Sequence, residues 1–197
     1  EVMTDHALTV GRVLRSSTAS FTIGTKTLAA AVPRFGGFVK AAAPDGGDII
    51  GLIYDVLIED DLFARQLIGA EVSAEYIADQ RTNRQVPIEI SVLVVGHARQ
   101  GSMYPYLPPQ PPISLDEIVA CSDTEVVQFT RDFTYFRTVL NAKDAPADEL
   151  LAASLRLANG ITFSSRGAGF EFGGTLEVDD AHGRGLALLL RREADEG

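Results

Sequence analysis

Short apolar runs interrupted by glycine and proline mark the start of this chain and limit the folds it can adopt. The stretch 32-VPRFGGFVKAAAPDGGDIIGLIYDV-56 contains two Gly-Gly pairs and two prolines among three such runs. Closely spaced short strands joined by glycine-rich turns are typical of small barrels and sandwiches. The same pattern begins near Leu8, so residues 8–56 predict a small β-barrel or sandwich.

Tight turns explain the glycines of this region without a bound ligand. Pro44-Asp45-Gly46-Gly47 has the residue types of such a turn, because proline presets φ for the second turn position and glycine accepts positive φ. We expect this turn to join a β-hairpin. We expect Gly36-Gly37 to bend the chain sharply into a strand.

A helical period and a further strand follow. Apolar residues recur at spacings of about three and four between Leu62 and Ile77, which predicts a helical insertion at 60–80. Residues 86–97 alternate and then become almost continuously apolar, as expected of a strand that becomes buried on both faces. We expect this strand to close a barrel that spans 8–113.

The segment 104-YPYLPPQPPI-113 is too rich in proline to form a central strand, and proline favours extended polyproline II geometry. Two interpretations stay open. The segment is either a strap that docks into an aromatic-lined groove or an extended connector that lies across its own domain. The connector is favoured.

Two amphipathic helices are expected next, one over 122–141 and a second within 144–160, as a helical hairpin over 122–160. Ser122 and Glu125 have capping-box spacing, and Gly160 follows a second helix predicted from Asp144. The barrel, the second helix or another chain could cover the apolar face of the first helix, and the second helix is favoured. The residues of this face are Val126, Phe129, Phe133, Phe136 and Leu140. If another chain contributes, the candidate partner-binding residues are Phe129, Phe133 and Phe136.

The remaining segment, 161–197, is rich in glycine and has a β-like pattern. A hairpin is predicted around Gly173-Gly174, and a short strand or helix at 186–192. The whole chain is therefore predicted to be mainly β with α (α+β). A small closed β-barrel with a helical insertion would precede the helical hairpin and this short C-terminal segment.

Charge and composition limit the partners and the compartment. The 197 residues are 46% apolar and carry a formal net charge of -10, which opposes broad binding to phosphate backbone because such binding depends on Lys and Arg. Cys121 is the single cysteine, and the sequence shows neither a leader pattern nor a run of roughly 20 apolar residues. These features predict a soluble cytoplasmic protein without membrane contact.

Signatures of catalysis and of cofactor binding are missing from the sequence. Gly24-Thr25-Lys26-Thr27 lacks the upstream glycine of a phosphate-binding loop and separates glycine from lysine. The three histidines have no metal-ligand spacing, and one cysteine cannot supply a thiolate site. We therefore expect a protein that is not an enzyme and that binds no cofactor or metal.

Several segments carry a family resemblance when taken in order. They are Gly11-Arg12-Val13, Ser20-Phe21-Thr22-Ile23, Phe35-Gly36-Gly37-Phe38-Val39, Ile49-Ile50-Gly51-Leu52-Ile53, the strand end Val94-Val95-Gly96 and the proline-rich exit 107–112. They resemble the HAS barrel, the small β-barrel shared by HerA-type hexameric ATPases and the nucleotide-binding subunits of ATP synthases. The resemblance covers approximately residues 9–140 and extends to stand-alone bacterial members that lack the ATPase domain.

The resemblance implies a non-catalytic interaction or assembly module. Such a module would serve a HerA-like hexameric DNA translocase, with its NurA-type nuclease, in DNA-end processing, and self-association into a homo-oligomer stays open. The alternative is a barrel that binds single-stranded nucleic acid, which the acidic net charge disfavours. Its basic contacts would be Arg12, Arg15, Lys26, Arg34 and Lys40. Its stacking residues would be Phe21, Phe35 and Phe38.

Overall fold

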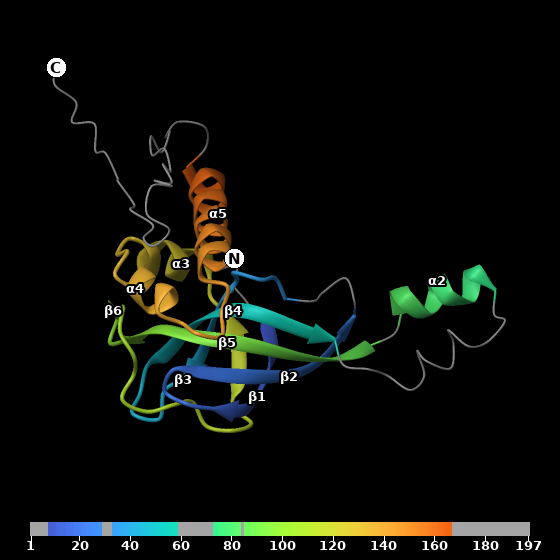
Figure 1. Ribbon diagram of the computed structural model, residues 1–197, viewed down its shortest axis with the longest axis horizontal. Coiled ribbons are helices and arrows are strands. Elements are labelled where there is room, and N and C mark those ends of the chain that lie inside the picture. The colour runs from blue at the N-terminus through green and yellow to red at the C-terminus, as the bar shows by residue number, and fades with distance from the viewer. Residues whose placement is uncertain (1–7, 29–32, 59–72, 84, 167–197) are drawn as a thin grey trace, which may run out of the picture. The chain divides into compact units, whose positions relative to one another are not determined.

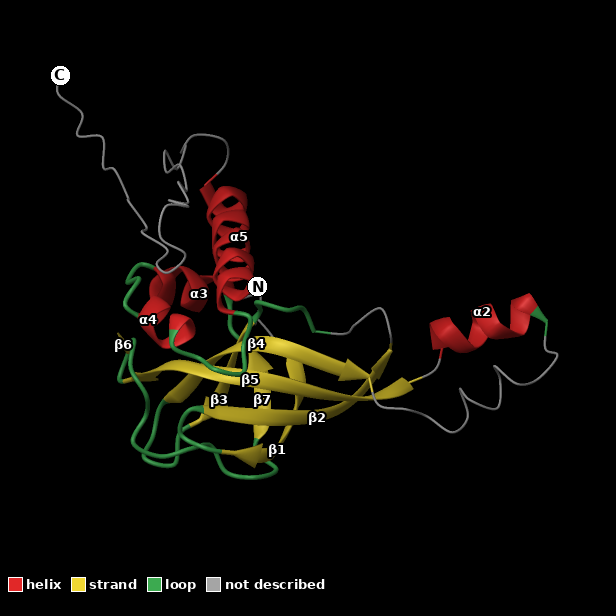
Figure 2. Cartoon of the chain, viewed as in Figure 1, coloured by secondary structure: helices red, strands yellow, loops and turns green. Residues whose placement is uncertain are grey.

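Six antiparallel strands close into a barrel in the computed structural model of the chain, which describes residues 8–28, 33–58, 73–83 and 85–166 (Figure 1). The barrel strands are β1 Thr9–Ser16, β2 Ser20–Leu28, β3 Phe38–Ala42, β4 Asp48–Ile58, β5 Gln85–Arg99 and β7 Glu117–Ala120. A further strand, β6 Ser102–Tyr104, forms a short hairpin with β5. The helices are α2 Ala74–Asn83, α3 Asp123–Thr130, α4 Tyr135–Leu140 and α5 Ala147–Arg166 (Figure 2). The chain divides into two units, residues 1–161 and 162–197, and the barrel belongs to the first.

The strand order around the barrel is β2-β1-β7-β3-β4-β5, and β5 pairs with β2 to complete the ring. The β2–β5 pair runs from Ser20 opposite Leu93 to Leu28 opposite Gln85. Closure gives partners to backbone groups that would otherwise form exposed sheet edges. The predicted fold class, mainly β with a small closed barrel and helices, is confirmed, as is closure by the strand predicted at 86–97.

Alternate residues of the strands fill the barrel interior, because successive side chains of a strand point to opposite faces. Val13 of β1 lies opposite Ile23 of β2, which lies opposite Ile90 of β5. Full burial of one such side chain contributes about 1.5–3 kcal/mol to the free energy of unfolding. The core residues with no exposed surface are Val13, Ile23, Ile49, Ile90, Val92, Val94 and Ile118.

The short strand β7 lies beyond the predicted barrel range of 8–113 and has no clear signal in the sequence. It pairs with β1 and with β3, so it joins two strands that are not paired with each other. Ile118 is the fully buried residue of this strand. A four-residue strand with a single buried residue is too short to show the alternation of apolar and polar residues by which a strand is predicted.

The proline-rich segment lies against its own barrel. Pro108 and Pro112 are buried, and the Ser16 hydroxyl of β1 donates a hydrogen bond of 2.6 Å to the Pro112 carbonyl. This packing agrees with the connector interpretation.

The C-terminal helices differ from the prediction in number and in extent. The continuous helix predicted over 122–141 is wrong, because the Thr134 N–H donates to Asp132 Oδ1 at 2.8 Å and the chain turns between α3 and α4. The predicted end at Gly160 is also wrong, since α5 continues to Arg166. An interior glycine costs a helix only about 1 kcal/mol, which the packing of a long helix can offset.

Parts of two predicted segments lie outside the described residues. Within the predicted insertion at 60–80, the structure describes 73–80, where α2 begins at Ala74. Residues 59–72 lie outside, as do the hairpin predicted around Gly173-Gly174 and the element predicted at 186–192.

The predicted hairpin turn between β3 and β4 is confirmed. Gly46 and Gly47 have φ of 92° and 96°, and the Gly46 N–H donates to the Ala43 carbonyl at 3.0 Å. The surroundings of the two glycines differ. A Cβ at Gly47 would lie 2.1 Å from the Ala98 carbonyl oxygen, whereas a Cβ at Gly46 would meet nothing within 4 Å.

Replacing Gly47 with alanine should destabilise the protein more than replacing Gly46. A left-handed backbone costs either alanine about 1–2 kcal/mol, and Gly47→Ala adds a clash with the backbone of β5. We expect the free energy of unfolding, measured by urea denaturation, to fall by about 1 kcal/mol for Gly46→Ala and by at least about twice as much for Gly47→Ala. Equal losses would contradict the clash.

Candidate functional site

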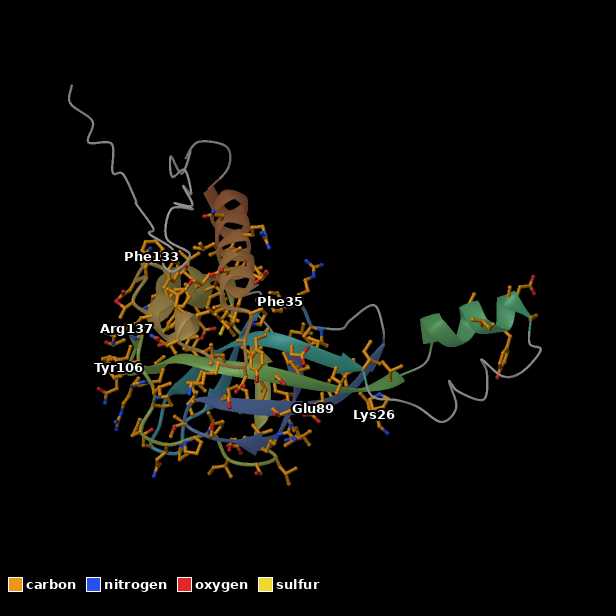
Figure 3. The ribbon with its side chains drawn as sticks, viewed as in Figure 1. Lys26, Phe35, Glu89, Tyr106, Phe133 and Arg137 are labelled. Atoms are coloured by element: carbon orange, nitrogen blue, oxygen red, sulfur yellow. The ribbon has the colours of Figure 1, made fainter. Side chains whose placement is uncertain are left out.

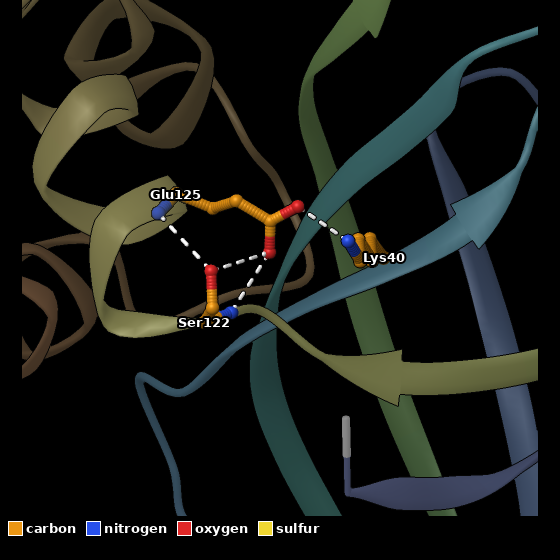
Figure 4. A network of polar contacts seen from close by, with 3 residues as sticks. All are labelled: Lys40, Ser122 and Glu125. Carbon is orange, nitrogen blue, oxygen red and sulfur yellow. Dashed lines mark hydrogen bonds and ion pairs between the residues drawn. The ribbon is translucent and has the colours of Figure 1, made fainter. Parts of the chain in front are cut away.

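A polar network joins α3 to the barrel. Ser122 is the N-cap of α3, its hydroxyl accepts the Glu125 N–H at 3.3 Å, and the Ser122 N–H donates to Glu125 Oε2 at 2.8 Å (Figure 4). The predicted capping box is therefore confirmed. Glu125 Oε1 also forms an ion pair with Lys40 Nζ of β3. Lys40, a candidate nucleic-acid contact, is thus paired with a carboxylate of its own chain.

The attraction within this ion pair outweighs the cost of its partial burial. Burial alone would raise the pKa of Glu125, but the hydrogen bonds from Lys40 and Ser122 outweigh burial and lower it. Burial alone would lower the pKa of Lys40, but the hydrogen bond to Glu125 and its charge outweigh burial and raise it. The two shifts agree in direction, because each charged group favours ionisation of the other.

The neighbouring thiol is unreactive. Burial raises the pKa of Cys121 to about 12, with a smaller contribution from the Glu125 charge. The thiolate is the nucleophilic and metal-binding form of cysteine, so this residue stays protonated and inert at neutral pH.

An aromatic cluster forms a second set of contacts between the barrel and the helices. Phe38 of β3 lies edge-on to Phe129 of α3 and to Tyr135 of α4, with ring centroids 6.0 and 6.3 Å apart. Tyr135 contacts Phe136 at 4.8 Å, and Phe136 contacts Phe133 at 5.2 Å. Such ring pairs add about 0.5–1.5 kcal/mol each beyond the area they bury.

The three candidate partner-binding residues therefore lie together, and the chain itself covers much of their surface. Phe129 and Phe136 are buried, while Phe133 is half-buried. The barrel covers this cluster through Phe38, and α5 approaches it through Ser154, whose hydroxyl lies 3.5 Å from the Tyr135 hydroxyl. Leu140, the last residue of the predicted face, is exposed.

The five basic residues of the alternative function are distributed over β1, β2, β3 and the corner before β3. Arg15 of β1 pairs with Glu89 of β5. Arg12 donates from Nη1 to a backbone carbonyl at 2.9 Å. Lys26 is exposed near the end of β2, well away from Phe133 (Figure 3). Arg34 is exposed in the corner before β3.

The candidate stacking residues are mostly inaccessible. Phe21 is part of the barrel core and Phe38 is part of the aromatic cluster, and both are buried. Phe35 is the exposed member of the three, at 38%. Two of the three rings are thus unavailable to a nucleobase without unfolding.

A ring cluster on the β5–β6 hairpin has no signal in the sequence. His97 stacks on Tyr104 at 5.1 Å and meets the edge of Tyr106 at 5.0 Å, and its Nδ1 lies 3.1 Å from the Tyr106 carbonyl oxygen. The pairing of His97 with Tyr104 across the hairpin creates this proximity. This ring cluster could be predicted only if the register between β5 and β6 were known.

The described part of the chain contains no candidate metal centre. It holds no group of three or more His, Cys, Asp or Glu side chains placed to bind a metal ion. Its helices are all too short or too polar to cross a membrane. No protein-family model and no curated protein matches the chain. The geometry defines a closed six-stranded barrel with packed helices.

Replacing Glu125 with glutamine should change how stability depends on pH. The pKa of Glu125 is lower in the folded than in the unfolded protein, so its contribution is complete above the unfolded value of about 4.3 and is lost as pH falls through the folded value. The pKa of Lys40 is raised, so its contribution is complete below the unfolded value of about 10.4 and is lost as pH rises through the folded value.

We therefore expect urea denaturation to show a loss of stability in Glu125→Gln that is greatest near neutral pH and shrinks below about pH 4. Asp123→Asn, in the same helical turn but exposed, is the matched control and should show a smaller difference. A difference between wild type and Glu125→Gln that does not vary with pH would contradict the assignment.

Proposed function

We propose that the chain is a non-catalytic interaction module that acts through the outer surface of its barrel and helices. The filled interior is the observation that carries this proposal: Val13, Ile23 and Ile90 have no exposed surface and belong to one continuous core. A small barrel that is filled by its own side chains has no interior space for a ligand. The binding function is therefore assigned to the outer surface.

The outer surface has features suited to a protein partner. Several large apolar side chains are more than half exposed, and such side chains mark interaction surfaces where they gather. They include Leu14, Leu57, Ile58, Tyr106, Ile113 and Leu115.

Direct binding of single-stranded nucleic acid has weaker support. Arg15 and Lys40 are paired with carboxylates, and Phe21 and Phe38 are buried. The net charge of -10 adds general repulsion to a phosphate backbone.

The resemblance of residues 9–140 to the HAS barrel supports one kind of partner. We infer that the module serves a HerA-like hexameric DNA translocase, with its NurA-type nuclease, in DNA-end processing in the cytoplasm. A homo-oligomer is the other assembly open to such a module. The inference about the partner rests on analogy of fold and on the segments within residues 9–140 that resemble the HAS barrel.

Tagged chain purified under mild conditions from its native cells should recover a HerA-like translocase. Mass spectrometry of the recovered proteins, followed by light scattering of the isolated complex, measures this. An unrelated small barrel with the same tag is the control. A chain that stays monomeric and recovers nothing above that control contradicts the interaction module.

The purified chain should bind single-stranded DNA only weakly. Non-specific contacts of this kind have dissociation constants of about 1 μM or weaker at physiological salt, and they weaken further as salt rises. Fluorescence anisotropy with a labelled oligonucleotide measures both properties. Submicromolar binding at physiological salt that is lost in Arg12→Gln, with Lys143→Gln as the charge-matched control, would favour the nucleic-acid alternative.

A further inference from the structure

The turn between β3 and β4 contains a chemically labile pair of residues, Asp45-Gly46. In such a pair the backbone nitrogen of the glycine can attack the side-chain carboxyl carbon of the aspartate, because glycine has no side chain to hinder the approach. The sequence holds one other pair in which glycine follows aspartate or asparagine, Asn159-Gly160. The structure places the two pairs in different surroundings.

Asp45 and Gly46 lie at the exposed end of the β3–β4 hairpin. A Cβ at Gly46 would meet nothing within 4 Å, so the space beside this peptide bond is open to a new ring. The Gly46 N–H donates to the Ala43 carbonyl, and ring closure therefore requires this bond to open. A hydrogen bond in an exposed turn opens at a small cost in free energy, because few packed side chains oppose the opening.

Asn159-Gly160 lies inside α5 instead. Ring closure requires rotation about the Cα–C bond of the first residue, and the successive backbone hydrogen bonds of an α-helix resist that rotation. In an unstructured chain asparagine before glycine reacts faster than aspartate, because a neutral amide accepts the attack more readily than an ionised carboxylate. The sequence alone would therefore point to Asn159, whereas the structure favours Asp45.

Arg99, the last residue of β5, restrains the reacting carboxylate. Its Nη1 donates to Asp45 Oδ2 at 3.3 Å. This ion pair limits rotation of the Asp45 side chain, so it slows the approach of the carboxyl carbon to the Gly46 nitrogen. Both side chains are exposed, and an exposed ion pair biases its groups by only about two- to fivefold. The restraint is therefore partial.

We propose that Asp45 is a modification site at which isoaspartate forms, and that the ion pair with Arg99 slows its formation. The Gly46 nitrogen bonds to Asp45 Cγ, the Cγ–OH bond breaks, the nitrogen loses its proton, and one water molecule leaves. Water then adds to either carbonyl of the succinimide ring and gives aspartate or isoaspartate, with no oxidant or reductant. The proposal is independent of the interaction module.

Isoaspartate at position 45 should weaken the hairpin. It adds a methylene group to the main chain of the turn, and the turn has no spare room towards β5, because a Cβ at Gly47 would lie 2.1 Å from the Ala98 carbonyl oxygen. It also displaces the carboxylate that pairs with Arg99. The isoaspartyl form, separated by chromatography, should melt at a lower temperature than the unmodified chain.

The test is to incubate the full chain at neutral pH, below its melting transition, and to follow isoaspartate over time. Methyl transfer from labelled S-adenosylmethionine by an isoaspartyl methyltransferase measures its amount, and peptide mapping by mass spectrometry locates it. Isoaspartate should appear at position 45 before Asn159 changes. Its rate of formation should rise about two- to fivefold in Arg99→Gln.

Two variants serve as controls. Arg137→Gln removes another exposed arginine, on α4, and should leave the rate unchanged. Asp45→Glu keeps the charge but disfavours ring closure, because the longer side chain would have to form a larger ring, so the signal should disappear. Circular dichroism verifies that each variant is folded.

A peptide of residues 42–49, incubated alongside, gives the rate of the same turn without the fold. The proposal is wrong if the folded chain shows no isoaspartate at position 45 by the time this peptide reaches its plateau. Deamidation of Asn159 ahead of any change at Asp45 would also overturn it. A rate in Arg99→Gln equal to that of wild type would overturn the role of the ion pair.

Discussion

Pairing of β2 with β5 closes the barrel, and both the core and the positions of the helices follow from this closure. These strands are distant in sequence, with Ser20 opposite Leu93 and Leu28 opposite Gln85, so their pairing closes a long loop at an entropic cost. The core offsets this cost, because Phe21, Ile23 and the alternate residues of β5 reach the interior together once the ring is closed. Closure also leaves β2 and β5 without free barrel edges.

The ring then fixes the helices through β3 and β7. Phe38 and Lys40 are two residues apart on β3, and they meet Phe129 and Glu125 of the same helix. A register slip of one residue would turn both side chains away. Because β7 pairs with β3 and ends just before Ser122, it also sets where α3 begins. The polar network and the aromatic cluster are therefore consequences of one strand register.

The barrel interior is used for packing, which leaves the outer surface for function. Apolar side chains fill the barrel, and Cys121 lies beside the polar network with its thiol protonated. The surface carries an unusual feature, the exposed Leu115 with a positive φ of 71°. Leu115 lies in the connection that leads into β7, and such connections tolerate functional residues without disturbing the core.

The β3–β4 turn and the capping box at Ser122 could be predicted from the sequence alone, because each depends on residues close together in the chain. The spacing of short apolar runs also indicated a small β-barrel or sandwich. The folded structure was needed to reveal the strand β7 and the pairing of the basic residues. These features depend on partners far apart in sequence, as Arg15 with Glu89 and Lys40 with Glu125 show. The exposure of Leu115 belongs to the same group, since periodicity can indicate which residues are apolar but not which of them the folded chain leaves uncovered.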